Sequence, residues 1–303
     1  MDILGLGCAT IDDLLYVAEY PPADSKQRVQ RRERQCGGLT ATALVAAARL
    51  GASCAYAGTS GLDDLSQFVL DSLEREGVDV SLVKRQAGAR PIHAVVIVDA
   101  IRQTRTLFYD MEGVLGAQDN WPEAKVIRSA RVLFVDHLGI KGMIRAARIA
   151  RETGVPVVAD FESNEMPQFP ELLDLVDHLI LSRSFAEQLT GQSDPGEATR
   201  ALWSNRREVV VITCGGQGCW AFTGSSAKGP KHHPAFQVDV VDTTGCGDVF
   251  HGAYAAALAC GHDMEECINF ASAAAALKAT RRGGQAGIPS RAAVKIFLES
   301  HTK

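Results

Sequence analysis

Two aspartates enclose a run of threonines and small residues late in the chain, Asp242-Thr243-Thr244-Gly245-Cys246-Gly247-Asp248. The valines at 238, 240 and 241 are typical of the end of a strand, and apolar residues at helical spacing predict a helix that opens at Asp248. Small residues at a helix N-terminus leave backbone N–H groups free to bind an anion. An anion-binding turn beside a carboxylate suits phosphoryl transfer, in which the carboxylate accepts the proton of the attacking hydroxyl. By spacing alone, a plain glycine turn with Asp248 as helix N-cap is an equal interpretation.

The same run resembles the Asp-Thr-x-Gly-Ala-Gly-Asp signature of the ribokinase-like (PfkB) carbohydrate kinases, with Cys246 where alanine is usual. The resemblance implies that Asp248 is the catalytic base and that the N–H groups of Gly245, Cys246 and Gly247 form the anion hole. It covers nearly the whole chain, because further segments follow in family order, near residues 12, 37–38, 213–218 and 281–289. The implied fold is α/β, a doubly wound and mostly parallel sheet flanked by helices. It forms a single domain of residues 1–303 with a small protruding β lid, built from about 13–35 and 90–112.

The patterning of the chain agrees with an α/β fold. From residue 126 on, strand-like and helical segments alternate, which predicts a parallel sheet with helices on both faces. Earlier strands are expected at 80–83, 92–98 and 104–109. Gly5-Leu6-Gly7 is followed by strand-like sequence rather than a helix, which rejects a dinucleotide-binding turn, and no Gly-Lys-Ser/Thr occurs for a Walker P-loop.

Composition limits the function classes. With 303 residues, 46% of them hydrophobic, the chain can build one large α/β domain or two smaller ones. A net charge of −5 gives no reason to expect a nucleic-acid partner, and no 18-residue apolar run predicts a membrane span. The N-terminus lacks a basic signal-peptide start, and the eight cysteines form no Cys-x-x-Cys pair. We therefore expect reduced thiols in a cytoplasmic protein.

Asp12 directly follows a strand end, where a solvated turn is the plain alternative to a ligand site. The resemblance implies that Asp12 holds sugar hydroxyls, and one carboxylate can accept two of them. It also implies that Gly37-Gly38 let the sugar approach the backbone. Ribokinases proper have Lys and Asn where Leu39 and Thr42 stand, which leaves Thr42 a candidate hydroxyl partner.

Three further side chains are candidate substrate contacts: Lys26, Tyr109 and His137. Lys26 belongs to a basic stretch of the expected lid and would meet an anionic group. A solvated lid face is the plain interpretation of that stretch, and a lone histidine is more often structural.

For the nucleotide, the resemblance implicates the Thr-x-Gly-x-x-Gly turn of Thr213, Gly215 and Gly218, for which a β-hairpin is the structural alternative. The Ala-rich helix at 267–279 would wall the adenine, with Ser272 as a polar contact. Relatives carry Asn-x-x-Glu near Mg²⁺, and here Ser182 and Phe185 replace both residues. Either Glu187 compensates, or Mg²⁺ relies on phosphates and water.

The loop at 281–289 resembles the family's C-terminal loop, whose carbonyl groups help to hold a monovalent cation such as K⁺ beside the anion hole. Cationic side chains cannot ligate a metal, so two of the implicated residues would contribute backbone oxygen only. By position the cation set is Asp242, Thr244, Lys278, Arg281, Gly283 and Gly287.

The sequence therefore predicts an ATP-dependent kinase that moves the γ-phosphoryl of ATP to a hydroxyl of a small sugar. The segments 239–254 and 276–289 look most like the sulfofructose kinase and fructokinase-like branch, and a ketohexose, a sugar acid and a sulfosugar all remain open. The alternatives are a nucleoside kinase of the same fold and a non-catalytic sugar or nucleotide sensor. A homodimer through the lid edge is also expected.

Overall fold

The computed structural model describes residues 1–102, 104–113, 115–224 and 229–301. Within this part of the chain, the main sheet has nine strands in the order β15-β14-β13-β12-β11-β10-β1-β4-β6. The strands from β13 to β6 are parallel, and β14 and β15 are antiparallel. Their bounds are β1 (Ile3–Leu6), β4 (Cys54–Tyr56), β6 (Val78–Asp79), β10 (Val132–Val135), β11 (Val157–Asp160), β12 (His178–Ser182), β13 (Val209–Thr213), β14 (Cys219–Phe222) and β15 (Lys231–His233).

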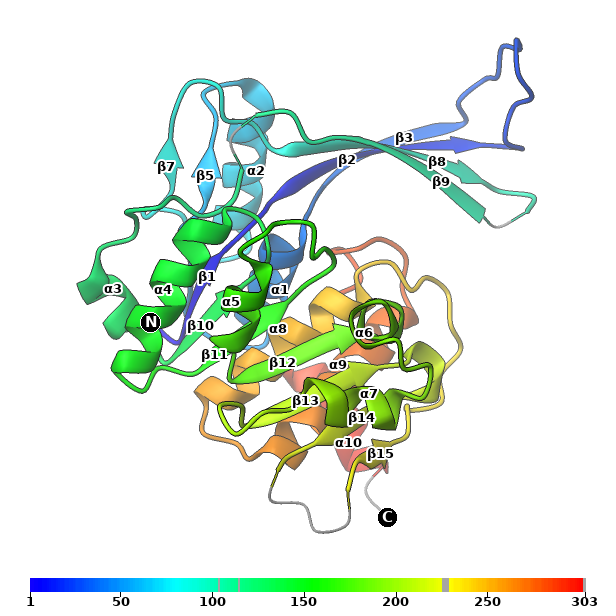
Figure 1. Cartoon of the computed structure of the whole chain (residues 1–303). Helices are drawn as coiled ribbons and strands as arrows, with labels where there is room; N and C mark the ends of the chain where they lie inside the picture. Colours follow the sequence, from blue (N-terminus) through cyan, green and yellow to red (C-terminus); the bar gives the residue numbers. More distant parts are fainter. Residues whose placement is uncertain (103, 114, 225–228, 302–303) are drawn as a thin grey trace.

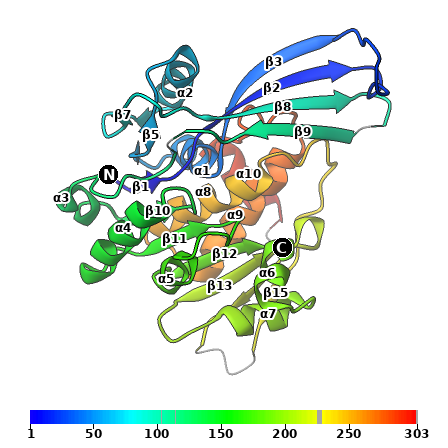
Figure 2. The same cartoon turned by 45° about the horizontal axis from the view of Figure 1, so that its top comes forward.

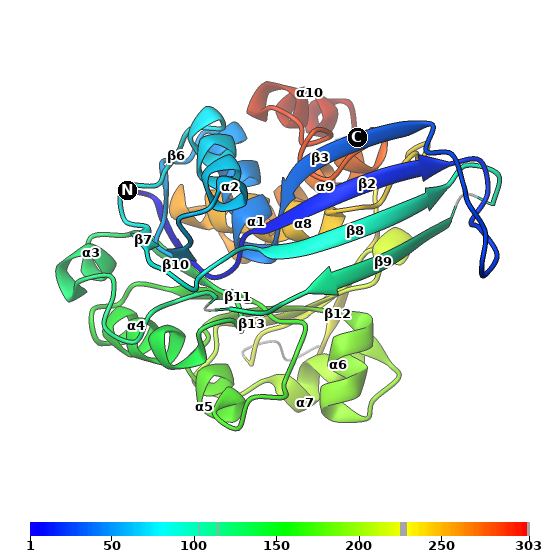
Figure 3. The ribbon, with the colours of Figure 1, turned by 90° about the horizontal axis from the view of Figure 1, so that it is seen from above.

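Helices cover both faces of this sheet, as the view from above shows (Figure 3). One face carries α1 (Leu39–Arg49), α2 (Asp64–Arg75), α8 (Cys246–Ala259), α9 (Met264–Ala279) and α10 (Arg291–His301). The other carries α3 (Ala124–Arg128), α4 (Ile140–Glu152), α5 (Phe169–Asp174), α6 (Arg183–Thr190) and α7 (Pro195–Leu202).

The central strands β1, β10 and β13 are almost entirely apolar because both faces of the sheet are covered there. In β10, Phe134 packs against the first helix layer, whereas Leu133 and Val135 pack against the second. The predicted doubly wound α/β fold is confirmed.

A second sheet of four strands, the small sheet, extends from one end of the molecule (Figures 1 and 2). Its strands lie in the order β3-β2-β8-β9, with bounds β2 (Thr10–Val17), β3 (Arg31–Gly37), β8 (Ile92–Asp99) and β9 (Thr104–Asp110). These strands correspond to the segments predicted for a lid, of which residue 103 lies outside the described residues. At its base, β5 (Thr59–Ser60) pairs with β7 (Lys84–Arg85).

Three local predictions are wrong. Residues 238–241 form no strand: Val240 and Val241 are 63% and 54% exposed, and the N–H of Val241 donates to the carbonyl of Ala279 at the end of α9 instead of to a sheet. Residues 80–83 form a turn between β6 and β7, closed by a 3.0 Å bond from Val83 N to Val80 O. Helix α8 begins at Cys246 rather than Asp248, because Gly245 takes the N-cap position.

Among the described residues, no helix is both long and apolar enough to span a membrane. All eight cysteines are free thiols.

Candidate active site

The start of α8 forms an open anion-binding turn. Gly245, the N-cap, has φ 73°, a left-handed conformation that favours glycine, and Asp248 lies in the first turn of the helix. A Cβ added to Gly247 would meet no atom within 4 Å among the described residues, so a ligand can reach the backbone here. The helix N–H groups and the helix dipole favour an anion at this point, which fits a phosphoryl group.

Asp248 lies in an unfavourable environment for a negative charge. Burial raises its pKa well above the ordinary carboxyl range, and the charges of Asp160 and Glu162 add to the effect. A carboxyl group of raised pKa is a better proton acceptor than an ordinary one once it is ionised.

His251 fixes the start of α8 against the main sheet. Its Nε2 lies 3.0 Å from the carbonyl oxygen of Ile180 in β12, and its Nδ1 lies 2.8 Å from the carbonyl oxygen of Gly247. The same Nδ1 lies 3.3 Å from Asp160 Oδ2 at the end of β11. Asp248 is therefore held near the carboxyl ends of β11 and β12, the edge at which parallel sheets bind ligands.

Asp12 lies on β2, with its carboxylate against the paired glycines before α1. A Cβ on Gly37 would lie 2.7 Å from Asp12 Oδ2, and one on Gly38 would lie 2.8 Å from Ala9 Cα. Gly38 also has φ 101°, so neither position accepts a larger residue without strain. Burial raises the pKa of Asp12, and Thr10 Oγ1 donates to its Oδ1 at 3.3 Å.

The register of the small sheet places predicted residues in one row. Asp12 pairs with Gln35 on β3 and with Ala94 on β8, and Ala94 pairs with Tyr109 on β9. Side chains of directly paired residues point to the same face of a sheet. Tyr109, 63% exposed, is thus on the face that carries Asp12.

This face of the small sheet is turned toward the catalytic turn. Arg105, on the Tyr109 face by the period of two along β9, donates from Nη1 to Thr244 Oγ1. Gln35 Nε2 lies 3.5 Å from the position of a Cβ on Gly283 in the 281–289 loop. Arg105 and Gln35 were not among the predicted site residues, although alternation along β9 and β3 could have placed them beside Tyr109 and Asp12.

Two predicted sugar contacts are not brought to Asp12. Lys26 belongs to the loop between β2 and β3. This loop lies at the far tip of the small sheet (Figure 1). From Asp12 to the end of β2 alone is about 16 Å at roughly 3.3 Å per residue. Thr42 is only 2% exposed and its hydroxyl accepts a bond from Gln285 Nε2 at 3.2 Å, so a sugar cannot reach it in this conformation.

His137 follows β10 at the same edge of the main sheet. Its Nδ1 is buried and has no hydrogen-bond partner among the described residues. The carboxylate of the neighbouring Asp136 is engaged within the protein, because its Oδ2 accepts bonds from Cys8 N at 2.7 Å and from Thr40 Oγ1 at 2.9 Å. Of the two, His137 is the one left with an unused polar atom for a ligand.

The predicted nucleotide residues lie at the neighbouring strand ends. Ser182 and Thr213 are paired at the ends of β12 and β13, and the turn after Thr213 contains a short 3₁₀ helix, η1 (Gly215–Gln217). This turn does join antiparallel strands, as the hairpin interpretation proposed. Gly218 is closely packed, because a Cβ at this position would lie 2.0 Å from the carbonyl oxygen of His233. Ser272 lies half-buried on α9.

The altered Asn-x-x-Glu segment has a structural explanation. Ser182 caps α6 by accepting a bond from Phe185 N at 3.3 Å, and Phe185 is 4% exposed, with its ring 6.1 Å from that of Phe169. At the position where relatives carry the glutamate, this chain has a phenylalanine that packs into the hydrophobic core. Among the described residues, no group of three or more His, Cys, Asp or Glu side chains could hold a metal ion.

The residues predicted for a monovalent cation lie at the junction of two segments. The Asp242 carboxylate accepts bonds from Thr244 N and Gly283 N, each at 2.9 Å, and so joins the 242–248 segment to the 281–289 loop. Lys278 was expected to contribute backbone oxygen only. In addition, its buried side chain donates from Nζ to the main-chain oxygen of Asp242 at 2.8 Å.

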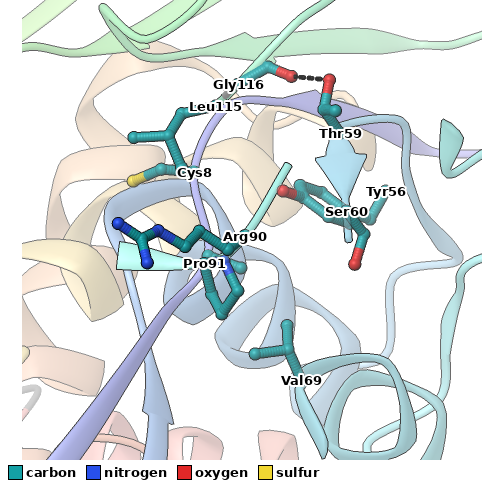
Figure 4. A pocket seen from close by; sticks show the side chains of 10 residues that line it. Cys8, Tyr56, Thr59, Ser60, Val69, Arg90, Pro91, Leu115 and Gly116 are labelled. Atoms are coloured by element: carbon teal, nitrogen blue, oxygen red, sulfur yellow. Dashed lines mark hydrogen bonds between the residues drawn. The ribbon is translucent and has the colours of Figure 1, made fainter. Parts of the chain in front are cut away.

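A narrow pocket lies at the base of the small sheet, where Arg90 extends toward Cys8 and Thr59 Oγ1 donates to Gly116 O at 2.7 Å (Figure 4). Arg90 also donates to Glu112 Oε2 at 2.8 Å, so its charge is balanced. None of the predicted substrate-binding residues lines this pocket. Two of its lining residues, Cys8 and Ala9, nevertheless lie against Gly38.

Taken together, an α/β fold with an anion-binding turn, an adjacent half-buried carboxylate and a sheet folded over both defines a phosphotransferase site. The model of the pfkB family carbohydrate kinases matches residues 4–291, and the chain belongs to this family. It is a carbohydrate kinase, as the sequence analysis predicted.

Relatives of known name agree with this assignment. Ribokinase of Haemophilus influenzae is 27% identical over 303 residues, covering 97% of both chains. Fructokinase-1 of Oryza sativa subsp. japonica is 30% identical over 292 residues, covering 87% of this chain and 88% of its own.

Solved structures give the same fold. A candidate ribokinase from Agrobacterium tumefaciens has a TM-score of 0.92 at 26% identity, covering 99% of this chain and 98% of its own. Ribokinase of Arabidopsis thaliana, solved with ribose and ATP, has a TM-score of 0.85 at 24% identity, with 98% of each chain covered.

Proposed function

We propose that this protein transfers the γ-phosphoryl group of ATP to a hydroxyl group of a small sugar. The single observation that carries the proposal is the juxtaposition of Asp248 with the open N-terminus of α8, under the face of the small sheet that holds Asp12. One group accepts a proton, one binds an anion and one binds hydroxyls, which are the three functions that a sugar kinase needs.

In this mechanism, Asp248 accepts the proton of the attacking hydroxyl. The backbone N–H groups of Gly245, Cys246 and Gly247 stabilise the negative charge on the phosphoryl group in transit. Because the described residues offer no acidic metal cluster, Mg²⁺ would arrive with ATP, held by phosphates and water, and would neutralise phosphate charge.

Binding roles follow from position. Asp12 accepts sugar hydroxyl bonds beside Gly37 and Gly38, with Tyr109 and His137 as further contacts. The nucleotide lies along the strand ends and α9, and its proposed contacts are Ser182, Thr213, Gly215, Gly218 and Ser272.

The chain acts as one kinase domain in which the small sheet is a lid. Contact of Arg105 with Thr244 supports a closed position over the site, which excludes water that would otherwise hydrolyse ATP. The outer strand β9 is exposed along its whole length, including Leu107 and Phe108, and this edge supports a homodimer formed through the lid. Light scattering of the wild type and of Phe108→Glu tests the dimer. The free thiols support the predicted cytoplasmic location.

Among the sugars that the family's kinases could accept, the site favours a neutral sugar. Relatives named ribokinase and fructokinase support ribose and a ketohexose equally. Lys26 lies far from Asp12 in this conformation, which removes the main argument for an anionic sugar such as a sulfosugar or a sugar acid.

The test is ADP release from Mg-ATP with fructose, ribose, tagatose, keto-deoxygluconate, sulfofructose and nucleosides as acceptors. We expect one neutral sugar to exceed the others by at least about tenfold in kcat/KM, and Asp248→Asn to abolish its turnover. A nucleoside as the best acceptor would replace the sugar assignment. If no acceptor stimulates ADP release although ATP and a sugar bind calorimetrically, the non-catalytic sensor is correct.

A further inference from the structure

Three oxygen atoms of Asp242 are each engaged by a donor from a different part of the chain. Its Oδ1 accepts from Thr244 N and its Oδ2 from Gly283 N, both at 2.9 Å. Its main-chain oxygen accepts from Lys278 Nζ at 2.8 Å.

Lys278 enters this arrangement from the last turn of α9 and is completely buried. A Cβ on Gly287 would lie 3.2 Å from Lys278 Cε and 3.2 Å from the carbonyl oxygen of Arg281. The side chain thus runs between the 242–248 segment and the 281–289 loop. This is the space in which the sequence analysis expected oxygens from these same residues to surround a monovalent cation.

A potassium ion does not fit that arrangement. The main-chain oxygen of Asp242, a residue of the expected cation set, already accepts an ammonium proton. A second positive charge at the same oxygen would be repelled by Lys278 in a buried setting, where charges are poorly screened. A charge is buried only where partners compensate it, and here the carbonyl and the nearby carboxylate of Asp242 do so.

The ammonium group of Lys278 lies close enough to the anion-binding turn to affect its electrostatics. Asp242 and Cys246 lie on the same short segment as the anion-binding turn, and the charge of Lys278 acts on both Cys246 and Asp248. A fixed positive charge beneath the turn supplements the α8 dipole and holds the two loops in register.

We propose that the ammonium group of Lys278 is a built-in replacement for the monovalent cation, joining the 242–248 segment to the 281–289 loop so that the kinase needs no K⁺. The inference rests on the proposed kinase function for its activity readout. Lys278 acts through the backbone of the turn and is a positioning residue.

The experiment compares four proteins in KCl, NaCl and tetramethylammonium chloride at equal ionic strength. Lys278→Ala removes the charge and leaves room for a cation, whereas Lys278→Met removes the charge but keeps most of the volume. Lys295→Ala, on the exposed side of α10, is the matched control because Lys295 faces solvent 3.9 Å from Glu299.

We expect wild-type kcat to vary less than about twofold among the salts. Lys278→Ala should lose at least about tenfold in NaCl and recover most of it in KCl, and Lys278→Met should lose as much without recovery. Stimulation of the wild type by K⁺ of fivefold or more would overturn the proposal. So would a Lys278→Ala variant that is fully active without K⁺, or one whose loss K⁺ does not restore.

Thermal unfolding supplies a readout that is independent of catalysis. The wild type should have the same Tm in KCl and NaCl, and Lys278→Ala should be selectively stabilised by K⁺. If no acceptor is phosphorylated in any salt, the proposed function fails, but this pattern of Tm values would still support the replacement. A K⁺-specific rise in the wild-type Tm would overturn it, even if Lys278→Ala does not fold.

Discussion

Replacement of Asp248 by asparagine should separate activity from stability. The amide preserves the shape of the side chain but cannot accept the hydroxyl proton. A positioned general base contributes about 10²–10⁴-fold to rate, or roughly 3–5 kcal/mol at 1.36 kcal/mol per tenfold. We expect kcat to fall by this factor, while Kd values for ATP and the sugar change little.

The same substitution should leave the fold as stable as the wild type or more stable. Burial and the neighbouring charges of Asp160 and Glu162 disfavour an ionised Asp248, and an amide removes that cost. Folding raises the pKa of this carboxyl group, so between the unfolded and folded pKa values the folded state binds more protons than the unfolded state. Wild-type stability relative to Asp248→Asn should therefore decline as pH rises through that interval.

The assays are single-turnover kinetics at saturating substrates and thermal unfolding at several pH values. Asp239→Asn, at an exposed position in the preceding segment, is the control and should behave as wild type in both assays. In the wild type, kcat/KM should rise with pH through the raised pKa of Asp248, because only the ionised form accepts a proton. A kcat for Asp248→Asn within tenfold of wild type, or a Tm well below wild type, would refute the reasoning.

Three other substitutions test how the site is held. Gly252→Ala should destabilise the folded protein by about 1–3 kcal/mol, because the new Cβ would lie 2.1 Å from Ala43 O on α1. Helix propensity alone would make the alanine variant more stable, so a raised Tm would contradict the close packing. Arg49→Met removes two 2.7 Å bonds to Glu76 and one to Gln285 O, and should cost about 1–3 kcal/mol in urea unfolding at neutral pH. Since Arg49 lowers the pKa of Glu76, this difference should shrink as pH falls through the carboxyl range, and a constant difference would exclude the ion pair as its source. Arg105→Gln should loosen the small sheet, raising the sugar KM by about fivefold or more and increasing ATP hydrolysis without sugar; unchanged values would show that this contact is not used in closure.

Much of the fold could be predicted because its signals are local. Runs such as Val132–Val135 and Val209–Val211 are apolar without alternation, which is typical of strands buried on both faces. The exceptions have tertiary causes. Val240 and Val241 have strand-forming side chains, but no strand of the described residues pairs with them, and their segment bonds to the end of α9 instead.

The residues of the candidate site also fall into two groups, those that local sequence predicts and those that depend on tertiary contacts. Asp248 and its turn could be found because all of the chemistry lies within seven consecutive residues. Lys26 was misplaced because sequence does not give the length over which the small sheet extends. Arg105 was missed because its contact to Thr244 spans 139 residues and exists only when the small sheet folds over the turn.

The sequence by itself determined the order of strands and helices, the anion-binding turn and the carboxylate beside it, since each depends on neighbours within a few residues. Only the tertiary structure decided which charges meet. Lys278 and Asp242 are 36 residues apart, and a buried ammonium is tolerated there because the fold delivers a carbonyl and a carboxylate to the same point. Whether that position holds a metal ion or a side chain is a property of packing, which a linear motif does not contain.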